Sequence, residues 1–308
     1  MTEGRHVAIL MASYNGAAFI RDQLQSILNQ DHTDWSLWIS DDGSDDETRQ
    51  IVEGFRRDCP DRTITLRDGP CEGSMKNFMS LICDEKIAAD YIAIADQDDV
   101  WLPEKLSRAL ALVGRQEGRP VLYGGRTIIV AENLSCLGTS PAFRRTLGFR
   151  NALVQSFAGG NTMLLNRAAR ELVIRGGDGA GAVCHDWWLY QLVSGAGGHV
   201  IYDTEPMVLY RQHDGNQIGS NNSLKAKFDR VRELLRGRYR NWNGRNIEAL
   251  RSAAEILTPE NRQILASFER LREVRGPRAL ALLKATGLYR QTRAGNMSLA
   301  LASLIGCL

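Results

Sequence analysis

The sequence lacks the hallmarks of several broad classes of protein. Its 308 residues contain no apolar run of the ~18 residues that a membrane-spanning helix needs. The six cysteines are scattered and form no Cys-x-x-Cys pair, which argues against a zinc site or a disulfide framework and favours a reducing compartment. The first residues lead directly into an apolar stretch without the pattern of a signal peptide, so we expect a cytoplasmic protein.

Two common phosphate-binding motifs are also missing. The first predicted strand, over 7–12, is followed by the polar turn Ser13-Tyr14-Asn15-Gly16, which has one glycine. A P-loop or a dinucleotide fingerprint would place several glycines there. A nucleotide at this position would therefore be held by carboxylates and a metal ion rather than by a glycine-rich loop.

Charge is nearly balanced overall but unevenly distributed. The net charge is +2, yet the residues from Leu224 onward hold 17 Lys/Arg and 7 Asp/Glu; the totals of 38 and 36 leave 21 and 29 for the rest. A basic C-terminal third suggests an anionic partner, either a membrane surface or a nucleic acid. Aromatic residues interleave poorly with the arginines, so we expect no nucleic acid. The alternative is a set of solvated helices, with apolar residues at helical intervals, that only pack on the rest of the chain.

The stretch 91–101 organises the rest of the chain. A mostly apolar run over 91–95 leads into Asp96, Asp98 and Asp99, and such a run is typical of a buried parallel strand. Carboxylates crowded at a strand end repel one another, and a hard divalent cation that carries a substrate's phosphates would neutralise them. The alternative is an acidic turn that caps the helix predicted to begin at Pro103.

Strands and helices alternate through the first half of the chain. We predict strands over 7–12, 35–40, 64–66 and 91–95, with helices between them and a further helix over 103–113. This alternation predicts an α/β fold with a doubly wound, mostly parallel sheet and helices on both faces. Shorter strands follow, and helices alone from Leu224. We place the domain boundary in the Gly/Ser/Asn-rich segment 215–223.

A second acidic cluster, Asp41-Asp42-Gly43-Ser44, ends the second predicted strand. It therefore lies on the same edge of the sheet as the first cluster. Its carboxylates can accept hydrogen bonds from a nucleobase N–H or a ribose hydroxyl. Asp and Ser are equally suited to a turn and to the N-cap of the next helix, and both roles can coexist.

Several motifs in this order resemble those of glycosyltransferase family 2, and its bacterial rhamnosyltransferase-like members above all. The resemblance covers roughly residues 6–219 and rests on five segments: Ala12-Ser13-Tyr14-Asn15-Gly16, Asp41-Asp42-Gly43-Ser44, Ala95-Asp96-Gln97-Asp98-Asp99-Val100-Trp101, Gly160-Asn161-Thr162 and His185-Asp186-Trp187-Trp188. It implies a GT-A fold, a nucleotide-sugar donor and inversion at the anomeric carbon. The catalytic domain would span 1–219, with a nucleotide-sugar half over 1–115 and an acceptor half over 116–219, and a basic helical region would span 220–308.

The resemblance also implies roles for the acidic residues. Asp41 and Asp42 would lie against the nucleoside, Asp96 would contact ribose or sugar, and Asp98 would bind Mg²⁺ or Mn²⁺ bridging the diphosphate. Asp99 would assist or only cap the following helix. Further residues are assigned to the donor: Ser13, Tyr14, Asn15, Lys76, Asn77, Gln97 and Arg211. His213 is a candidate third metal ligand, and the alternative for it is a purely structural role.

An inverting transfer needs a general base for the acceptor hydroxyl. Asp186 is our candidate, because it follows a glycine-rich loop and begins an apolar helix; His185 competes with it, and an N-cap role is the alternative. Adjacent helical residues point about 100° apart, so at most one of Trp187 and Trp188 would stack on an acceptor sugar. The remaining acceptor-binding candidates are Gly160, Asn161 and His185.

The sequence thus predicts a metal-dependent inverting glycosyltransferase of bacterial surface polysaccharide synthesis. The resemblance favours L-rhamnose from dTDP-rhamnose as donor and a glycan or lipid-linked hydroxyl as acceptor, at the inner face of the membrane. A sugar-phosphate nucleotidyltransferase is the second hypothesis, although its triphosphate loop is absent. A non-catalytic nucleotide- or carbohydrate-binding module is the third, and its behaviour would not depend on Asp186.

Overall fold

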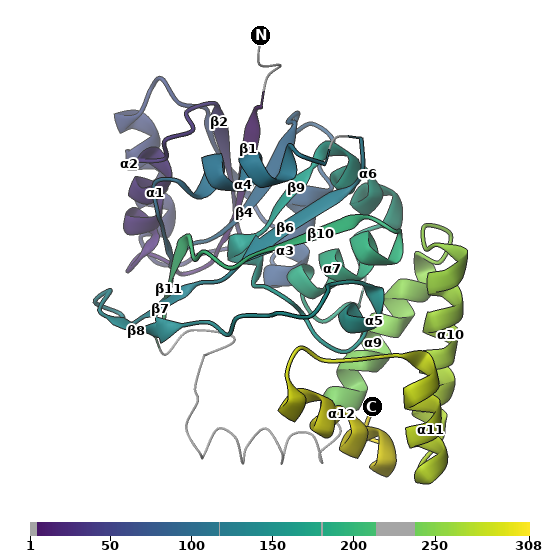
Figure 1. Cartoon of the computed structure of the whole chain (residues 1–308). Coiled ribbons are helices and arrows are strands. Elements are labelled where there is room, and N and C mark those ends of the chain that lie inside the picture. Colours follow the sequence, from purple (N-terminus) through teal and green to yellow (C-terminus); the bar gives the residue numbers. More distant parts are fainter. Residues whose placement is uncertain (1–4, 117, 180, 214–237) are drawn as a thin grey trace.

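The protein is built around one seven-stranded sheet (Figure 1). This computed structural model describes residues 5–116, 118–179, 181–213 and 238–308. The strand order is β10-β6-β9-β4-β1-β2-β3. All its strands run parallel except β9, which is antiparallel to β4 and β6, so the prediction of a mostly parallel sheet is confirmed. The strands are β1 (Val7–Ser13), β2 (Trp35–Asp41), β3 (Ile64–Asp68), β4 (Tyr91–Asp96), β6 (Val121–Gly125), β9 (Leu164–Asn166) and β10 (His199–Asp203).

Helices cover both faces of the sheet. In β1, Ile9 packs on one face and Leu10 on the other, because successive side chains of a strand point in opposite directions. Both side chains are fully buried, which explains why the strand sequence is continuously apolar. The Ile9 face is covered by α1 (Ile20–Leu28), α2 (Thr48–Asp58) and α4 (Lys105–Val113). The Leu10 face is covered by α3 (Ser74–Ile82), α5 (Phe149–Ala152), α6 (Arg167–Gly176) and α7 (His185–Gly195).

A second, smaller sheet lies beyond the carboxyl end of β4. Its order is β5-β11-β7-β8, with β5 (Val100–Trp101), β7 (Ile128–Val130), β8 (Cys136–Thr139) and β11 (Val208–Arg211). Pairing of β11 with β5 brings the end of β11 beside the acidic turn after β4. The sequence did not reveal β5 or β8, because β5 has two residues and β8 is almost wholly exposed and shows no apolar alternation.

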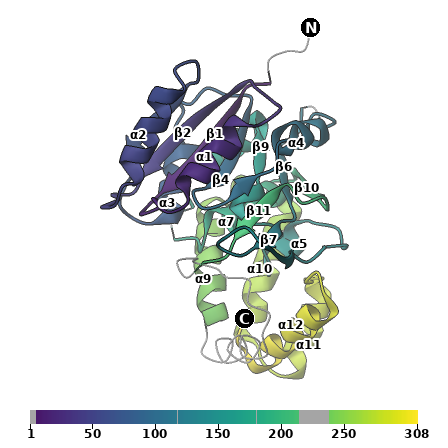
Figure 2. The same cartoon turned by 90° about the vertical axis from the view of Figure 1, so that its left-hand side faces the viewer.

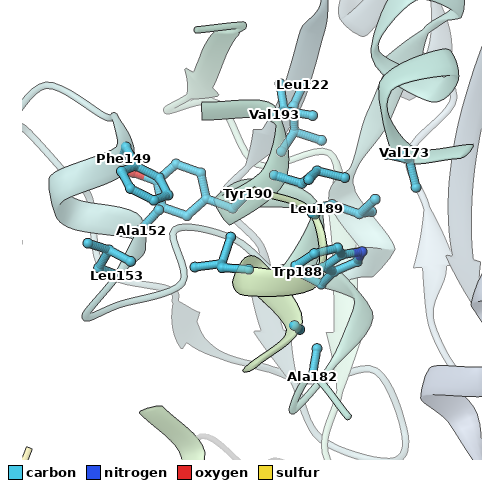
Figure 3. Packing of buried hydrophobic residues seen from close by; sticks show 14 of the residues in the cluster. Leu122, Phe149, Ala152, Leu153, Val173, Ala182, Trp188, Leu189, Tyr190 and Val193 are labelled. Carbon is cyan, nitrogen blue, oxygen red and sulfur yellow. The ribbon is translucent and has the colours of Figure 1, made fainter. Parts of the chain in front are cut away.

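The described C-terminal helices share their core with the sheet. These are α9 (Arg238–Ser252), α10 (Pro259–Glu273), α11 (Pro277–Thr286) and α12 (Arg293–Ile305). Leu250 and Phe268 belong to the same buried cluster as Leu10 and Trp188. Figure 3 shows the part of this cluster around Trp188, Tyr190 and Phe149. The expected domain boundary at 215–223 falls outside the described residues. Within the described parts of the chain, every helix is too short or too polar to cross a membrane.

Candidate active site

The strand register brings the two acidic clusters to one edge of the sheet. Asp96 at the end of β4 is level with Ala12 of β1, and Asp41 at the end of β2 is level with Ser13 of β1. The three strand ends therefore meet side by side. Ligands of open α/β sheets bind at this edge.

Three carboxylates converge after β4. One oxygen each of Asp96, Asp98 and Asp99 lies within 4.8 Å of the others. Burial, with the negative charges of Asp98 and Asp186, raises the pKa of Asp96 to about 8. Two conclusions follow. Without a cation the cluster would bind a proton rather than carry all of its negative charges, and the charge of Asp186, 90 positions along the chain, acts on Asp96.

Asp98 and His213 form a pair suited to a divalent cation. His213 Nε2 lies 2.8 Å from Asp98 Oδ2, and both side chains are mostly buried. The ring of His213 packs against Phe19 at a centroid distance of 4.6 Å, which fixes its orientation. Neighbouring ligands of an octahedral cation at about 2.1 Å lie about 3 Å apart, so the pair fits Mg²⁺ or Mn²⁺ with little rearrangement. Strand β11 of the second sheet, which ends two residues before His213, thus positions this ring beside the carboxylates.

Asp99 ties three segments together rather than capping a helix. It is fully buried, and Asn161 Nδ2 donates to its Oδ2 at 2.5 Å while Arg211 N donates to its Oδ1 at 3.2 Å. The N-cap of α4 is Glu104, so the capping alternative for Asp99 is wrong. Burial lowers the pKa of Lys105, the first residue of α4, to about 7, although the charge of Asp99 opposes this. Lys105 is thus a buried lysine that interacts with this carboxylate, and the sequence analysis missed it.

Asp41 and Asp42 are both held by hydrogen bonds from nearby loops. Asp41 is buried and accepts from the hydroxyls of Ser13 at 2.8 Å and Ser44 at 2.7 Å. Burial would raise the pKa of Asp41, but these bonds outweigh it and lower the pKa. Asp42 accepts from the backbone N–H groups of Cys71 at 2.7 Å and of Gly73 at 2.8 Å. The turn alternative is therefore confirmed for Asp41. The N-cap alternative is wrong, since α2 has Glu47 at that position.

The turn after β1 is fixed by Gln97. The Gln97 amide accepts from Tyr14 N at 3.0 Å and donates to Tyr14 O at 2.9 Å. An added Cβ at Gly16 would overlap the Gln97 side chain, so this packing requires the glycine. Asn15 N donates to Ser44 Oγ at 2.9 Å and connects this turn to the Asp41 loop. The Tyr14 side chain itself is 58% exposed beside the site.

Lys76 and Asn77 differ in their availability to a ligand. Lys76 Nζ forms an ion pair with Asp178 at 2.9 Å on the partly exposed start of α3. Asn77 is buried and donates to Ser40 O at 2.8 Å, which anchors α3 to the end of β2. Lys76 can therefore exchange Asp178 for a phosphate as its partner. Asn77 instead holds α3 against the end of β2.

Arg211 has a structural role that differs from the expected contact with diphosphate. Its side chain is 4% exposed, and it donates to Asp22 Oδ2 at 2.7 Å, to Glu132 O at 2.5 Å and to Asp98 O at 3.0 Å. The guanidinium also lies 4.8 Å from the Phe19 ring centroid. Because its donors are directed at protein acceptors from three segments, Arg211 holds the turn after β4 in place. On its outer side is a cleft of about 550 Å³ that is also lined by Ala18, Phe19, Ala131, Glu132, Asn133 and Ser135.

The start of α7 separates Asp186 from His185. Asp186 lies in the first turn, and Trp187 N donates to its Oδ1 at 2.6 Å, while the N-cap residue is Cys184. His185 packs on the Phe78 ring at a centroid distance of 4.1 Å, and its Nε2 adjoins Gly160. Burial lowers the pKa of His185 against the opposing charge of Asp186. His185 is thus a neutral core residue, whereas Asp186 is half-buried and interacts with Asp96.

The two tryptophans after Asp186 are core residues. Trp188 is completely buried, and Trp187 is 5% exposed with its Nε1 donating to Ala152 O at 2.6 Å. Neither ring has a face open to solvent, so the sequence-based expectation of sugar stacking by one of them is not supported. The α7 helix is apolar on all sides because it is enclosed between the sheet and the C-terminal helices. Gly160 and Asn161 lie in the η1 turn (Gly160–Thr162), where both are buried.

The chain belongs to glycosyltransferase family 2. A sequence profile described as "Glycosyl transferase family 2" matches residues 8–172. The chain is 32% identical over 248 residues to "dTDP-rhamnosyl transferase RfbG" of Shigella flexneri, covering 74% of this chain and 80% of that protein. It is 30% identical to "Putative teichuronic acid biosynthesis glycosyltransferase TuaG" of Bacillus subtilis, over 34% of this chain and 40% of that one.

Solved structures confirm the GT-A fold. Residues 1–349 of S. aureus TarS, in complex with UDP-GlcNAc, superpose with a TM-score of 0.52 at 14% identity, covering 90% of this chain and 83% of that one. The mannosyltransferase PcManGT from Pyrobaculum calidifontis, in complex with GDP-Man and Mn²⁺, gives a TM-score of 0.51 at 17% identity, covering 96% and 85%. The chain is thus a family 2 glycosyltransferase of GT-A architecture, with a rhamnosyl transferase among its relatives.

Proposed function

We propose that the protein transfers a sugar from a nucleotide-diphosphate donor to an acceptor hydroxyl with inversion at the anomeric carbon. One observation carries this proposal: one oxygen each of Asp96, Asp98 and Asp99 lies within 4.8 Å of the others at the strand ends, and the charge of Asp186 acts on Asp96. A donor diphosphate at Asp98 and an acceptor hydroxyl at Asp186 would then be neighbours. That is the arrangement a direct displacement needs.

The residues present fit a divalent cation, Mg²⁺ or Mn²⁺. Asp98 and His213 would hold it, with Asp96 beside them and Asp99 below. A bound cation would stabilise the negative charge that develops on the departing nucleotide diphosphate. The remaining donor contacts fall to the exposed Tyr14 and the loops that Asp41 and Asp42 hold, with Lys76 available to the phosphates.

We assign Asp186 the role of general base. A carboxylate can accept the proton of the acceptor hydroxyl as the new C–O bond forms. Its neighbours are less suited to this role: burial and the charge of Asp186 raise the pKa of Cys184, whereas burial lowers the pKa of His185, which makes it a weaker base, and its ring packs on Phe78 in the core. Asn161 is buried and donates to Asp99 Oδ2, so it would support the cluster beneath a bound acceptor.

The donor and the acceptor are proposed from the relatives. The name of RfbG supports dTDP-rhamnose as the donor of L-rhamnose. The name of WfgD from Escherichia coli, "UDP-Glc:alpha-D-GlcNAc-diphosphoundecaprenol beta-1,3-glucosyltransferase", supports a glycan carried on a lipid; WfgD is 28% identical over 40% of this chain and 46% of that protein. We therefore propose a role in bacterial surface polysaccharide synthesis, in the cytoplasm at the inner face of the cell membrane.

Thermal unfolding with nucleotides tests the assignment. We expect dTDP with Mn²⁺ to raise the melting temperature more than UDP or GDP with Mn²⁺, and a chelator to abolish the shift. The variant Asp186→Asn should keep this shift while losing release of dTDP from dTDP-rhamnose. A chain that binds no nucleotide diphosphate would contradict the proposed function, and unchanged turnover in Asp186→Asn would contradict the assignment of the base.

A further inference from the structure

Helix α12 exposes an apolar face that no charged residue interrupts. Met297 is 74% exposed, Leu301 50% and Leu304 36%. Their spacing of four and then three residues places them on one side of the helix. The opposite side is buried through Leu299 and Ala302. A surface helix usually has charged residues on its outer face, but the chain has no charged side chain between Arg293 and Leu308.

The surroundings of this face are purely basic. Residues 275–308 contain five Lys/Arg and no Asp or Glu. Arg293 lies one turn before Met297, and Arg275 lies against Gly306 beside the last turn of α12. None of the ion pairs among the described residues involves Arg275, Arg278, Lys284 or Arg293, all of which are exposed. The apolar stripe is therefore bracketed by cations at both ends.

Helix α11 extends the same surface. Gly276 N donates to Leu304 O at 2.8 Å, and Ser303 Oγ reaches Ala279 O, so the start of α11 is fixed to the end of α12. Leu280 of α11 is 38% exposed. We call Leu280, Met297, Leu301 and Leu304, with the four exposed cations, the α11–α12 surface. Because hydrogen bonds fix these two short helices to each other, they form one rigid surface, and neither is long enough to cross a membrane.

The position of this surface matches the position of the site. The amino end of β1 marks the edge of the sheet opposite to the acidic clusters. Figures 1 and 2 show α11 and α12 at the end of the molecule that lies away from the amino end of β1, in both views. The α11–α12 surface therefore lies toward the side on which the strand ends carry Asp96 and Asp41.

We propose that the α11–α12 surface docks on the anionic surface of a phospholipid bilayer. Apolar side chains that protrude from a short helix, with cations around them and no acidic residue, match an interface of acyl chains beneath anionic headgroups. A protein partner would need acidic side chains opposite the four cations of this surface. A second copy of this chain would instead place like charges opposite each other. This inference deepens the proposed function, on which it rests for its purpose: a docked enzyme meets a lipid-linked acceptor at the membrane.

Flotation of the full-length protein with vesicles tests the proposal without nucleotide or acceptor. We expect binding to vesicles of phosphatidylcholine with 30% phosphatidylglycerol, weaker binding to phosphatidylcholine alone, and loss of binding as salt is raised from 0.15 to 0.5 M. Leu301→Asp should weaken partitioning at least tenfold. Its matched control is Leu137→Asp, at an exposed leucine of β8 that is 63% exposed and outside the α11–α12 surface.

A second pair of variants tests the charges. Arg278→Glu with Arg293→Glu should weaken partitioning at least ~25-fold, about fivefold for each cation lost. The control Arg57→Glu changes an exposed arginine of α2, and this variant should bind to the vesicles as the wild type does. The proposal is overturned if the wild type ignores anionic vesicles or if the variants float with them unchanged. It is equally overturned if Leu301→Asp only converts a dimer into a monomer. Because dTDP binding is measured separately, a failure here leaves the proposed function standing.

Discussion

Replacing Arg211 by methionine separates a structural role from contact with the donor. Arg211→Met removes three hydrogen bonds and the stacking on Phe19, and it leaves the carbonyls of Asp98 and Glu132 without these donors. A fully buried acceptor without a donor costs about 1–3 kcal/mol, and because these two bonds are only partly buried the lower end of that range applies to each. The lost ion pair with Asp22 adds little, because that carboxylate is 53% exposed. Methionine refills part of the volume, so we expect a net loss of roughly 3 kcal/mol of unfolding free energy.

A loss of that size would be visible in thermal unfolding. At about 2–4 °C per kcal/mol, the melting temperature should fall by roughly 6–12 °C without any ligand. Arg211→Lys should fall nearly as far, because one ammonium cannot reach acceptors in three segments as a planar guanidinium does. The weakened metal-binding turn should also raise the Mn²⁺ concentration needed for the dTDP-induced shift.

The opposite pattern would refute this reasoning. If Arg211 contacts the donor diphosphate directly, Arg211→Met should melt as the wild type does and yet lose dTDP binding, while Arg211→Lys should retain it. Arg57→Met, at an exposed arginine of α2 outside any described ion pair, is the matched control for loss of one positive charge.

Three further predictions concern individual carboxylates. Asp186→Asn should lower kcat by at least ~10²-fold in an assay of released dTDP, with the dTDP-induced thermal shift retained; loss of both would indicate a folding defect instead. Asp98→Ala should abolish the Mn²⁺-dependent part of the dTDP shift and leave the ligand-free melting temperature close to that of the wild type, and isothermal titration with Mn²⁺ provides the independent check. Burial alone would raise the pKa of Asp203, but hydrogen bonds from Arg108 and Tyr123 outweigh burial and lower this pKa in the folded protein. The stabilisation that the ionised Asp203 contributes is present above its unfolded-state pKa near 3.8 and disappears as the pH falls through the lower folded-state pKa. Asp203→Asn should therefore flatten the decline in unfolding free energy below about pH 4, as measured by urea titration, and an unchanged acid limb would contradict this.

The regular part of the fold could be predicted because its pattern is local. A helix was predicted between the strands over 64–66 and 91–95, and α3 (Ser74–Ile82) is that helix, since its apolar residues recur at helical spacing. The apolar run before Asp96 is β4, one residue longer than predicted. By contrast, β8 and the four-residue α5 have no pattern of their own and exist through their partners. The reversed direction of β9 depends on pairing with β4 and β6, which the sequence does not show.

The same limit applies to the site. Both acidic clusters were found because strand ends of a parallel sheet meet at one edge. Whether a particular side chain is available to a ligand depends on partners that are distant in sequence. Arg211 ends strand β11, but its guanidinium already donates hydrogen bonds to Asp22 and Glu132. Trp188 was a candidate for the acceptor, but it is fully buried in a cluster that also includes residues of α9 and α10, far along the chain. Asp22 carries no sequence signal that would have identified it.

The Asp99 carboxylate has a consequence for how this enzyme could diversify. One buried side chain links the turn after β4 to the η1 turn and to β11, so these three segments cannot shift independently. A change in sugar or acceptor preference that moved any of them would misalign the others. New specificities should therefore arise on the rim, for example in the exposed β7–β8 hairpin, where residues can be inserted without disturbing the reacting groups.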